Sequence, residues 1–276
     1  MPRELKGMVC VITGASSGIG AALARELSRA GAWLALGARR LDLLERLNAG
    51  LGGGHLVIPT DVADEAQCRR LVEQAAEHFG RIDTLVANAG YGIDKKTVDL
   101  SSREVAEMFA VNVFGTLDCI RPAVTAMRLQ EPRDGWRGQI MITSSVLARR
   151  GVPYAGPYSA TKAAQLSLAE TLRLELSPER IAVTSVHPTA TESEFGQVAR
   201  QRGNVEIRRR SSGLGMQTAE HVARRMARAM QRPAREVWPA RHMRYLMGLN
   251  AWLPALGDVL VARATRRRSG GDREVR

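Results

Sequence analysis

Residues 8–20, MVCVITGASSGIG, carry the clearest signal for the fold. The first six residues form a short apolar run, which is typical of a strand buried on both faces of a parallel sheet. A glycine-rich turn follows, and residues 19–30 then have the apolar spacing of a helix, with Gly31 as a stop signal. A buried strand that passes through a glycine turn into a helix is the first half of a βαβ unit.

The alternation of strand and helix continues along the chain. We expect strands at 33–37, 55–58, 84–87, 139–143 and 181–187, and helices at 41–48, 64–79, 102–128 and 157–176. Alternating strands and helices with short connections wind into a twisted parallel sheet. The sequence therefore predicts the α/β class: a Rossmann-like doubly wound parallel sheet with helices on both faces. We expect one catalytic domain, residues 1–235, and a C-terminal helical extension, residues 236–276.

The net charge of +12 is confined to the last part of the chain. Residues 1–196 contain 22 Lys and Arg and 22 Asp and Glu, whereas residues 197–276 contain 18 and 6. The three cysteines are widely spaced, so we expect no disulfide framework, no metal site and a cytoplasmic location. We expect no signal peptide, and no run reaches the roughly 18 apolar residues of a membrane span.

The glycine turn is a candidate phosphate-binding site. Gly14 permits a tight turn, Gly18 lets the backbone approach a pyrophosphate, and Gly20 permits close packing of helix and strand. The helix N-terminus would present free N–H groups to the phosphates. The G-x-x-x-G-x-G spacing differs from the dinucleotide fingerprint, however, and such a turn alone is equally compatible with a steric role.

A second pattern predicts acid–base chemistry. Tyr158 and Lys162 are four residues apart on a predicted helix and therefore share one face. A neighbouring ammonium favours phenolate and brings the pKa of a phenol towards the working range. Such a pair alone would usually be a surface pair. Here it lies 13 residues after Ser145, which ends the strand-like run 140–145.

Together these motifs resemble the classical short-chain dehydrogenase/reductase family. Its T-G-x-x-x-G-I-G and S-x12-Y-x3-K motifs are matched at Thr13, Gly14, Gly18, Ile19, Gly20, Ser145, Tyr158 and Lys162. The resemblance covers about residues 6–240. It implies an oxidoreductase that interconverts a carbonyl and an alcohol by hydride transfer with a nicotinamide cofactor.

The resemblance also implies roles for individual residues. Tyr158 would donate or accept the proton, Lys162 would assist it and bind the nicotinamide ribose, and Ser145 would hydrogen-bond the substrate oxygen. Ser144 is the adjacent candidate, but the spacing favours Ser145. Asn112 would relay protons through water to the lysine; the alternative is a helix-interior residue that bonds its own backbone.

The residues after the second strand bear on the choice of nucleotide. An acidic residue there would bond both ribose hydroxyls and repel a 2′-phosphate. Instead Ala38 is followed by Arg39 and Arg40, whose guanidinium groups can bind a phosphate, and Ser16 could add a hydroxyl. The alternative is that both arginines are solvated residues at the start of a helix. Because the acidic residue is absent, we favour NADP over NAD.

Further cofactor contacts are implied by the resemblance alone. These are Ser17 and Ile19 in the turn, Asp61 and Val62 at the adenine, Asn88, Ala89 and Gly90 beside the cofactor, and Pro188 and Ser193 near the nicotinamide. Two positions depart from the family pattern: Ala87 precedes Asn88 in place of a second Asn, and Thr189 replaces a Gly. We expect His187 to be a strand-end residue and not a catalyst.

Residues 194–216 are expected to form the variable loop over the substrate. Phe195 and Val198 give it apolar contacts, and the run 208–210 is basic. A pocket of this kind could accept a hydrophobic ketone or an anionic carrier such as an acyl thioester. We expect a hydrophobic carbonyl or alcohol substrate.

The extension contains two short amphipathic segments, residues 245–253 and 255–262, divided by Pro254. They could cover the pocket, pack in a dimer, or lie on an anionic membrane surface, in which case the protein would be peripheral to the membrane. Nucleic-acid binding ranks after the lid or packing role and the membrane role, because Trp238 and Trp252 form no evident stacking platform.

Two expectations concern the protein as a whole. Family members often pair through the two long helices, here 102–128 and 157–176, so we expect a homodimer or homotetramer. The competing function is a non-catalytic NADP-sensing or scaffold protein of the same fold. Loss of the Ser, Tyr or Lys would mark that class, and all three are present.

Overall fold

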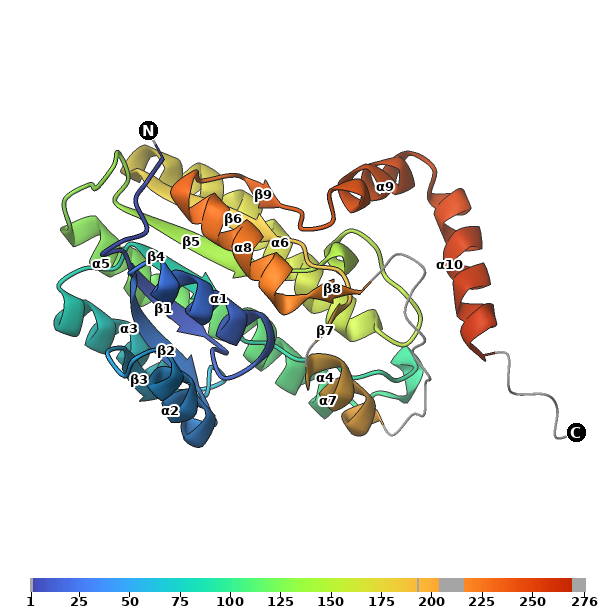
Figure 1. Ribbon diagram of the computed structural model, residues 1–276. Helices are drawn as coiled ribbons and strands as arrows, with labels where there is room; N and C mark the ends of the chain where they lie inside the picture. The colour runs from blue at the N-terminus through green and yellow to red at the C-terminus, as the bar shows by residue number, and fades with distance from the viewer. Residues whose placement is uncertain (1, 193, 204–215, 270–276) are drawn as a thin grey trace, which may run out of the picture.

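The computed structural model describes residues 2–192, 194–203 and 216–269, with side chains up to Arg263. Its centre is a seven-stranded parallel sheet in the order β3-β2-β1-β4-β5-β6-β9 (Figure 1). The strands are β1 (Val9–Thr13), β2 (Trp33–Ala38), β3 (Leu56–Pro59), β4 (Thr84–Ala87), β5 (Gly138–Thr143), β6 (Ile181–Val186) and β9 (Glu236–Val237). The predicted Rossmann-like fold is confirmed.

Helices cover both faces of the sheet. One face carries α1 (Gly18–Arg29), α2 (Leu41–Gly50) and α8 (Ala219–Gln231). The opposite face carries α3 (Glu65–Phe79), α5 (Gly115–Leu129) and α6 (Gly156–Leu176). Strand β1 serves both layers, because Cys10 and Ile12 pack on one face and Val11 on the other. Burial on both faces explains why the strands are continuous apolar runs in the sequence.

The predicted helix 102–128 is interrupted. It consists of α4 (Ser102–Phe109), a π-helical turn η2 (Ala110–Phe114) and α5. Single π-helical turns inside helices are frequent at functional sites. Asn112 lies in this turn, and its side chain is buried.

Residues 188–235, for which no helix or strand was predicted, contain several elements in the structure. Helix α8 packs Val222, Met226 and Met230 against α1 and the sheet. Two short strands, β7 (Thr191–Glu192) and β8 (Gln217–Thr218), pair in parallel as a separate sheet. Strand β9 pairs with β6, so the main sheet includes two residues beyond the expected boundary at 235.

All strands of the main sheet run in parallel, so their carboxyl ends lie at one edge. The order in which strands are added reverses at β1: β2 and β3 lie on one side of it, and β4 and the later strands lie on the other. Ligands of open α/β sheets bind outside the carboxyl ends of the strands at such a switch point. Three short 3-10 helices are also among the described elements of the body: η1 (Thr97–Asp99), η3 (Val146–Ala148) and η4 (Ser177–Glu179).

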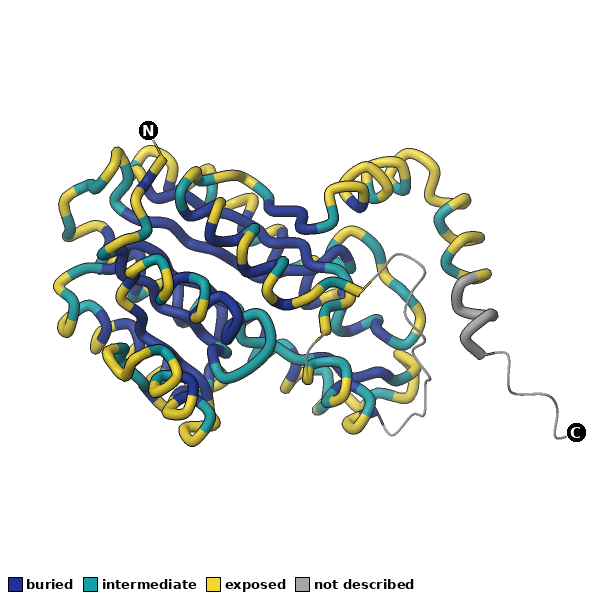
Figure 2. Tube along the Cα trace, viewed as in Figure 1, coloured by how far each residue is buried: buried dark blue, intermediate teal, exposed yellow. Residues whose placement is uncertain are grey.

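The C-terminal extension forms two helices, α9 (Arg241–Trp252) and α10 (Pro254–Ser269). The division at Pro254 is the one that the sequence predicts. Both helices stand away from the sheet on the side where its strands end, and they are mostly exposed (Figure 2).

Candidate active site

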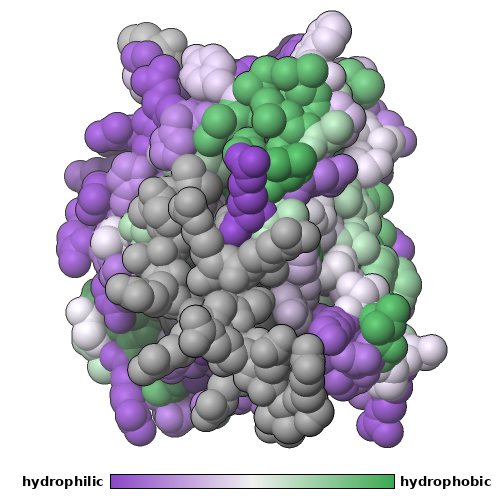
Figure 3. Space-filling model, turned by 90° about the vertical axis from the view of Figure 1, so that its right-hand side faces the viewer, coloured by the Kyte–Doolittle hydropathy of each residue, from purple (hydrophilic) through white to green (hydrophobic). Residues whose placement is uncertain are grey.

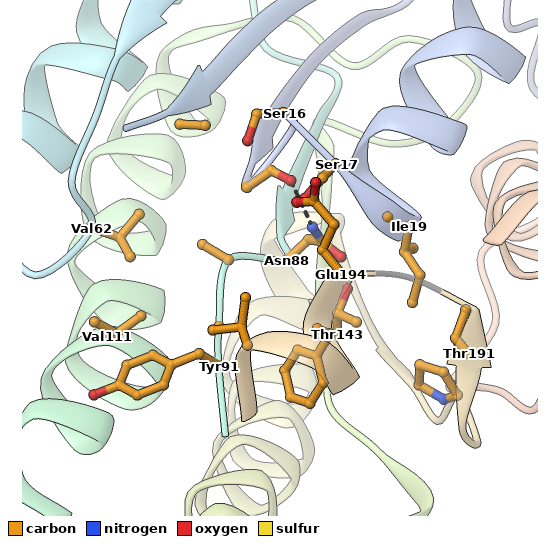
Figure 4. Close-up of a pocket in the computed structure, with 18 of the residues that line it drawn as sticks. Ser16, Ser17, Ile19, Val62, Asn88, Tyr91, Val111, Thr143, Thr191 and Glu194 are labelled. Atoms are coloured by element: carbon orange, nitrogen blue, oxygen red, sulfur yellow. Dashed lines mark hydrogen bonds between the residues drawn. The ribbon is translucent and has the colours of Figure 1, made fainter. Parts of the chain in front are cut away.

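A pocket of about 360 Å³ lies at the carboxyl edge of the sheet (Figure 4). The predicted residues that line it are Gly14, Ser16, Ser17, Gly18, Ile19, Arg39, Arg40, Asp61, Val62, Asn88, Ala89, Gly90, Ser145, Tyr158, Lys162 and Pro188. Gly20 and Asn112 do not line the pocket, and Ser193 lies outside the described residues. Segments up to about 170 residues apart in the sequence therefore meet at one site.

The glycine turn is shaped by close backbone contacts. Gly14 has a φ of +64°, and a Cβ added there would lie 2.9 Å from the Cα of Ala89. A Cβ on Gly20 would lie 2.3 Å from the carbonyl oxygen of Gly14. Asn88 closes the turn from β4, donating from Nδ2 to the carbonyl oxygen of Thr13 at 3.1 Å. The turn thus brings the N-terminus of α1 to the pocket wall, where its N–H groups can meet phosphates.

One corner of the pocket gathers donors for an anion. Nη2 of Arg40 donates to Oγ of Ser17 at 3.0 Å and lies 3.4 Å from Oγ of Ser16. The same nitrogen pairs with a carboxylate oxygen of Glu194 at 2.8 Å, and Figure 4 shows Glu194 beside Ser16 and Ser17. This hydrogen bond lowers the pKa of Glu194. Arg39 lines the same pocket with an exposed side chain.

Glu194 is a residue that the sequence analysis missed. It begins α7 (Glu194–Gly203), 154 residues from its partner Arg40. No local pattern in the sequence connects the two. The carboxylate of Glu194 thus already accepts a hydrogen bond from Arg40, the guanidinium donor that follows β2.

Helix α6 presents Tyr158 and Lys162 to the pocket, as the four-residue spacing predicts. Nζ of Lys162 lies 5.6 Å from the centroid of the Tyr158 ring. Lys162 is buried and donates to the carbonyl oxygen of Thr143 at 2.9 Å and to Oε1 of Gln165 at 2.8 Å. Burial lowers the pKa of Lys162 to about 7. An amine at this pKa can gain or lose a proton near neutral pH.

Asn112 reaches out of its helix. Its Nδ2 donates to the carbonyl oxygen of Tyr91 at 2.9 Å and to Oγ1 of Thr161 at 3.0 Å. Its Oδ1 accepts from the backbone N–H of Tyr91 at 3.0 Å. The side chain therefore fixes the loop after β4 to the lysine-bearing helix, and the alternative of a bond within its own helix does not hold.

Gln165 connects Asn112 with Lys162. Its Nε2 donates to the carbonyl oxygen of Asn112 at 2.6 Å and to Oγ1 of Thr116 at 2.9 Å, while its Oε1 accepts from Lys162. From the sequence, a water molecule was expected between Asn112 and Lys162. Gln165 was not predicted as a site residue. The available signal was its place three residues after Lys162 and seven after Tyr158, on one helix face.

The two candidate serines differ in their hydrogen bonds. Oγ of Ser144 donates to the carbonyl oxygen of Lys162 at 2.9 Å and so supports the helix. Oγ of Ser145 accepts from the backbone N–H of Leu147 at 3.1 Å, which leaves its hydroxyl hydrogen available to a substrate. His187 is buried after β6, and its Nδ1 lies 3.2 Å from the carbonyl oxygen of Ser145.

Helix α7 covers the end of the pocket next to Tyr158. The ring of Phe195 lies 5.4 Å from that of Tyr158, and Val198 lines the same wall. The guanidinium of Arg202 lies 4.3 Å from the centre of the Tyr91 ring. The expected loop over the substrate thus begins as a helix, and its residues 204–215, including the basic run, lie outside the described residues.

Within residues 2–192, 194–203 and 216–269, no group of three or more His, Cys, Asp and Glu is arranged to hold a metal ion.

The doubly wound sheet, the glycine turn at a helix N-terminus and the Ser145, Tyr158 and Lys162 side chains at one pocket define a nucleotide-binding oxidoreductase. A family model described as short chain dehydrogenase matches residues 8–204. The chain belongs to the short-chain dehydrogenase/reductase family.

Curated relatives extend over much of the chain. It is 34% identical over 232 residues to "Glycine betaine reductase ATRR" of Emericella nidulans, covering 83% of this chain and 18% of that protein. It is 37% identical over 216 residues to "11-beta-hydroxysteroid dehydrogenase A" of Arachis hypogaea, covering 75% of this chain and 59% of that one. The chain therefore spans less than two thirds of the length of either relative.

Two solved structures show the same fold. A short-chain dehydrogenase/reductase from Burkholderia phymatum, in complex with NAD, has a TM-score of 0.80 and 28% identity, covering 92% of this chain and 96% of that one. An alcohol dehydrogenase from Thermococcus sibiricus, complexed with 5-hydroxy-NADP, has a TM-score of 0.71 and 30% identity, with coverage of 84% and 95%. Structural neighbours of this chain thus include proteins that bind either nucleotide.

Proposed function

We propose that this protein is an NADP-dependent oxidoreductase that interconverts a carbonyl and an alcohol, with Tyr158 as the acid and base. One observation carries the proposal: Ser145, Tyr158 and Lys162 line the same pocket as the anion-binding corner at Arg40. A reacting centre and a site for a phosphate thus lie along one cavity, as a dinucleotide requires.

The donors at the end of β2 support NADP over NAD. Glu194 acts there as a stand-in anion, since its carboxylate lies on Arg40 beside the serine hydroxyls. A phosphate can use the same donors, because guanidinium groups bind carboxylate and phosphate with similar geometry. We assign the 2′-phosphate to Arg39, Arg40 and Ser16, and the diphosphate to the glycine turn. When bound, NADP supplies or accepts the hydride.

The protein's own groups handle the proton. The Lys162 ammonium lies beside the Tyr158 ring and favours the phenolate form by its charge. Tyr158 Oη donates a proton to the carbonyl oxygen in reduction and accepts it in oxidation. Ser145 Oγ hydrogen-bonds the same oxygen and stabilises its developing charge. Because the pKa of Lys162 is about 7, this amine can pass a proton on from Tyr158 at neutral pH.

The walls of the pocket favour a hydrophobic ketone or alcohol as substrate. Tyr91, Phe195 and Val198 line the end next to Tyr158. An acyl thioester is the competing substrate class. We further propose a homodimer or homotetramer through α4, α5 and α6, which is supported by two exposed apolar side chains, Phe114 in η2 between α4 and α5 and Leu174 on α6.

A panel of ketones, aldehydes and acyl thioesters, assayed by NADPH absorbance, tests the proposal. We expect turnover of at least one hydrophobic carbonyl by the wild type, with a higher kcat/KM for NADPH than for NADH. Tyr158→Phe should lower kcat by about 10²- to 10⁴-fold, the usual contribution of a positioned acid or base. NADPH binding, measured by fluorescence titration, should remain.

Two results would contradict this function. Persistent turnover in Tyr158→Phe would remove Tyr158 as the acid and base. Normal NADPH binding by a wild type that turns over no member of the panel would favour the non-catalytic NADP-sensing or scaffold protein.

A further inference from the structure

The two C-terminal helices expose an unusual number of large apolar side chains. Along α9 and its C-cap residue Leu253, these recur at positions i, i+1, i+4, i+7 and i+8 and therefore share one face. Trp252 is 86% exposed and Tyr245 is 73% exposed. We call this face, continued on α10, the arm surface; its residues are Tyr245, Leu246, Leu249, Trp252, Leu253, Leu256, Val259 and Leu260. Figure 3 shows a hydrophobic patch at the top of this side of the molecule, with hydrophilic side chains around it.

Helices α9 and α10 are held against the rest of the protein by residues outside the arm surface. Met243, on the opposite side of α9, is buried against Val146 and Trp238. Arg150 donates to Oδ1 of Asn250 at 3.1 Å and also pairs with Asp258 of α10. The arm surface is therefore turned outward by packing and hydrogen bonds to the body.

Positive charges accompany the arm surface. Arg241, Arg244 and Arg263 are exposed on the same two helices. Residues 241–269 contain six arginines and a single acidic residue, Asp258, which Arg150 engages. An exposed apolar face with aromatic residues and arginines is typical of helices that lie in the interface of an anionic membrane.

We propose that the arm surface docks on the surface of an anionic lipid membrane. Two other occupants that the sequence left open fit less well. A lid is disfavoured because no described residue of α9 or α10 lines the pocket. A second copy of the arm would bring arginines against arginines, whereas anionic lipid headgroups complement them.

The geometry of the helices fits attachment to the surface of the bilayer. No single helix in the described part of the chain is long and apolar enough to cross a membrane. Residues Arg241–Trp252 and Pro254–Arg263 meet that criterion only as a pair, by length and composition, and they are bent by 119°. An interfacial helix needs one apolar face and no spanning length.

Docking would also orient the pocket. Met243 of α9 packs on Val146, the residue after Ser145, and both helices lie on the side where the strands end (Figure 1). The catalytic edge would then face the lipid, where apolar substrates partition. The docking itself does not depend on the proposed reaction.

Sedimentation of the full-length protein with lipid vesicles tests the proposal. We expect it to bind vesicles of phosphatidylcholine with phosphatidylglycerol on the order of tenfold more tightly than phosphatidylcholine alone, since each arginine near an anionic surface adds to the attraction. Added salt should weaken binding by screening.

Two double variants separate the apolar and the electrostatic contributions to vesicle binding. The double variants Leu249→Glu with Trp252→Glu, and Arg241→Glu with Arg244→Glu, should each lose binding to the anionic vesicles on the order of tenfold. Because these side chains are exposed, the melting temperature and the NADPH affinity should stay at wild-type values. Leu129→Glu is the matched control: Leu129 is 86% exposed at the end of α5, and its variant should bind like the wild type.

Three outcomes would overturn the proposal. The first is equal binding to neutral and anionic vesicles, and the second is equal loss in Leu129→Glu. The third is a wild type that ignores vesicles but sediments as an oligomer that Leu249→Glu with Trp252→Glu dissociates. That result would make the arm surface an interface between copies of the chain.

Discussion

The pocket and the arm surface differ in which kind of side chain they bury and which they expose. Around the pocket, buried polar groups such as Lys162, Asn112 and Gln165 bond one another and the backbone. On the arm surface, large apolar groups such as Trp252 remain exposed. Burying a polar group without a hydrogen bond costs free energy, and a large apolar patch is rarely left exposed to water. Among the described residues, these polar groups around the pocket are therefore bonded within the chain, whereas the apolar groups of the arm surface are left uncovered.

The largest effect that would sharpen this comparison concerns the anion-binding corner. Arg39→Asp replaces an attractive charge by a repulsive one, so it should raise the KM for NADPH on the order of 100-fold, with little change for NADH. Glu194→Gln should act in the opposite direction and tighten NADPH binding, because its carboxylate competes for Arg40. Initial rates with both nucleotides measure this, and equal effects of Arg39→Asp on the two would refute the NADP assignment.

A smaller effect is expected inside the polar network. Gln165→Leu keeps the volume but leaves Lys162 and the Asn112 carbonyl each without one partner. We expect a loss of about 2 kcal/mol in the free energy of unfolding, measured by urea denaturation.

Gln165→Glu is the matched variant for position 165. It places a carboxylate on Lys162 and should raise the pKa of this lysine, which moves the pH profile of kcat/KM to higher pH. A structural role alone would leave that profile unchanged. An unshifted profile in both variants would show that Gln165 does not position Lys162.

The smallest effect, taken per pH unit, follows from the buried charge of Lys162. Burial lowers its pKa from the ordinary 10.5 to about 7. Between these values the unfolded chain binds more protons than the folded one, so the free energy of unfolding of the wild type rises with pH. Below about pH 7 Lys162 is charged in both states, and the folded protein then bears the full cost of burying that charge. Lys162→Met lacks this titration. Its stability advantage should shrink by up to about 1.4 kcal/mol per pH unit above pH 7.

Denaturation of the free wild-type protein and of Lys162→Met, followed from about pH 6 to about pH 9 so that the shifted pKa of about 7 lies inside the range, measures this difference. Groups far from Lys162 titrate equally in both proteins and cancel. A difference that does not change with pH would mean that Lys162 keeps its proton in the folded protein.

The sequence located most of the pocket because its signals are local. A glycine turn between a buried strand and a helix, and a tyrosine four residues before a lysine, carry their geometry within a few residues of chain. The parallel sheet then follows from the alternation of elements, and it brings all strand ends to one edge. For the same reason the two C-terminal helices and their division at Pro254 could be predicted.

Contacts between distant segments could not be predicted in this way. Glu194 reaches Arg40 across 154 residues, and the Gln165 amide reaches the Asn112 carbonyl across 53. Helix α8 could have been found from its apolar spacing, but its place against α1 depends on the packing of the sheet.

From the sequence alone, the class of fold and most of the side chains that line the candidate active site could be predicted, because backbone conformation and helical periodicity are set by neighbouring residues. Only the tertiary structure decided which groups hold Lys162, which anion meets Arg40 and which face of the C-terminal helices stays uncovered. Burial and hydrogen bonding depend on what the fold brings together from far along the chain.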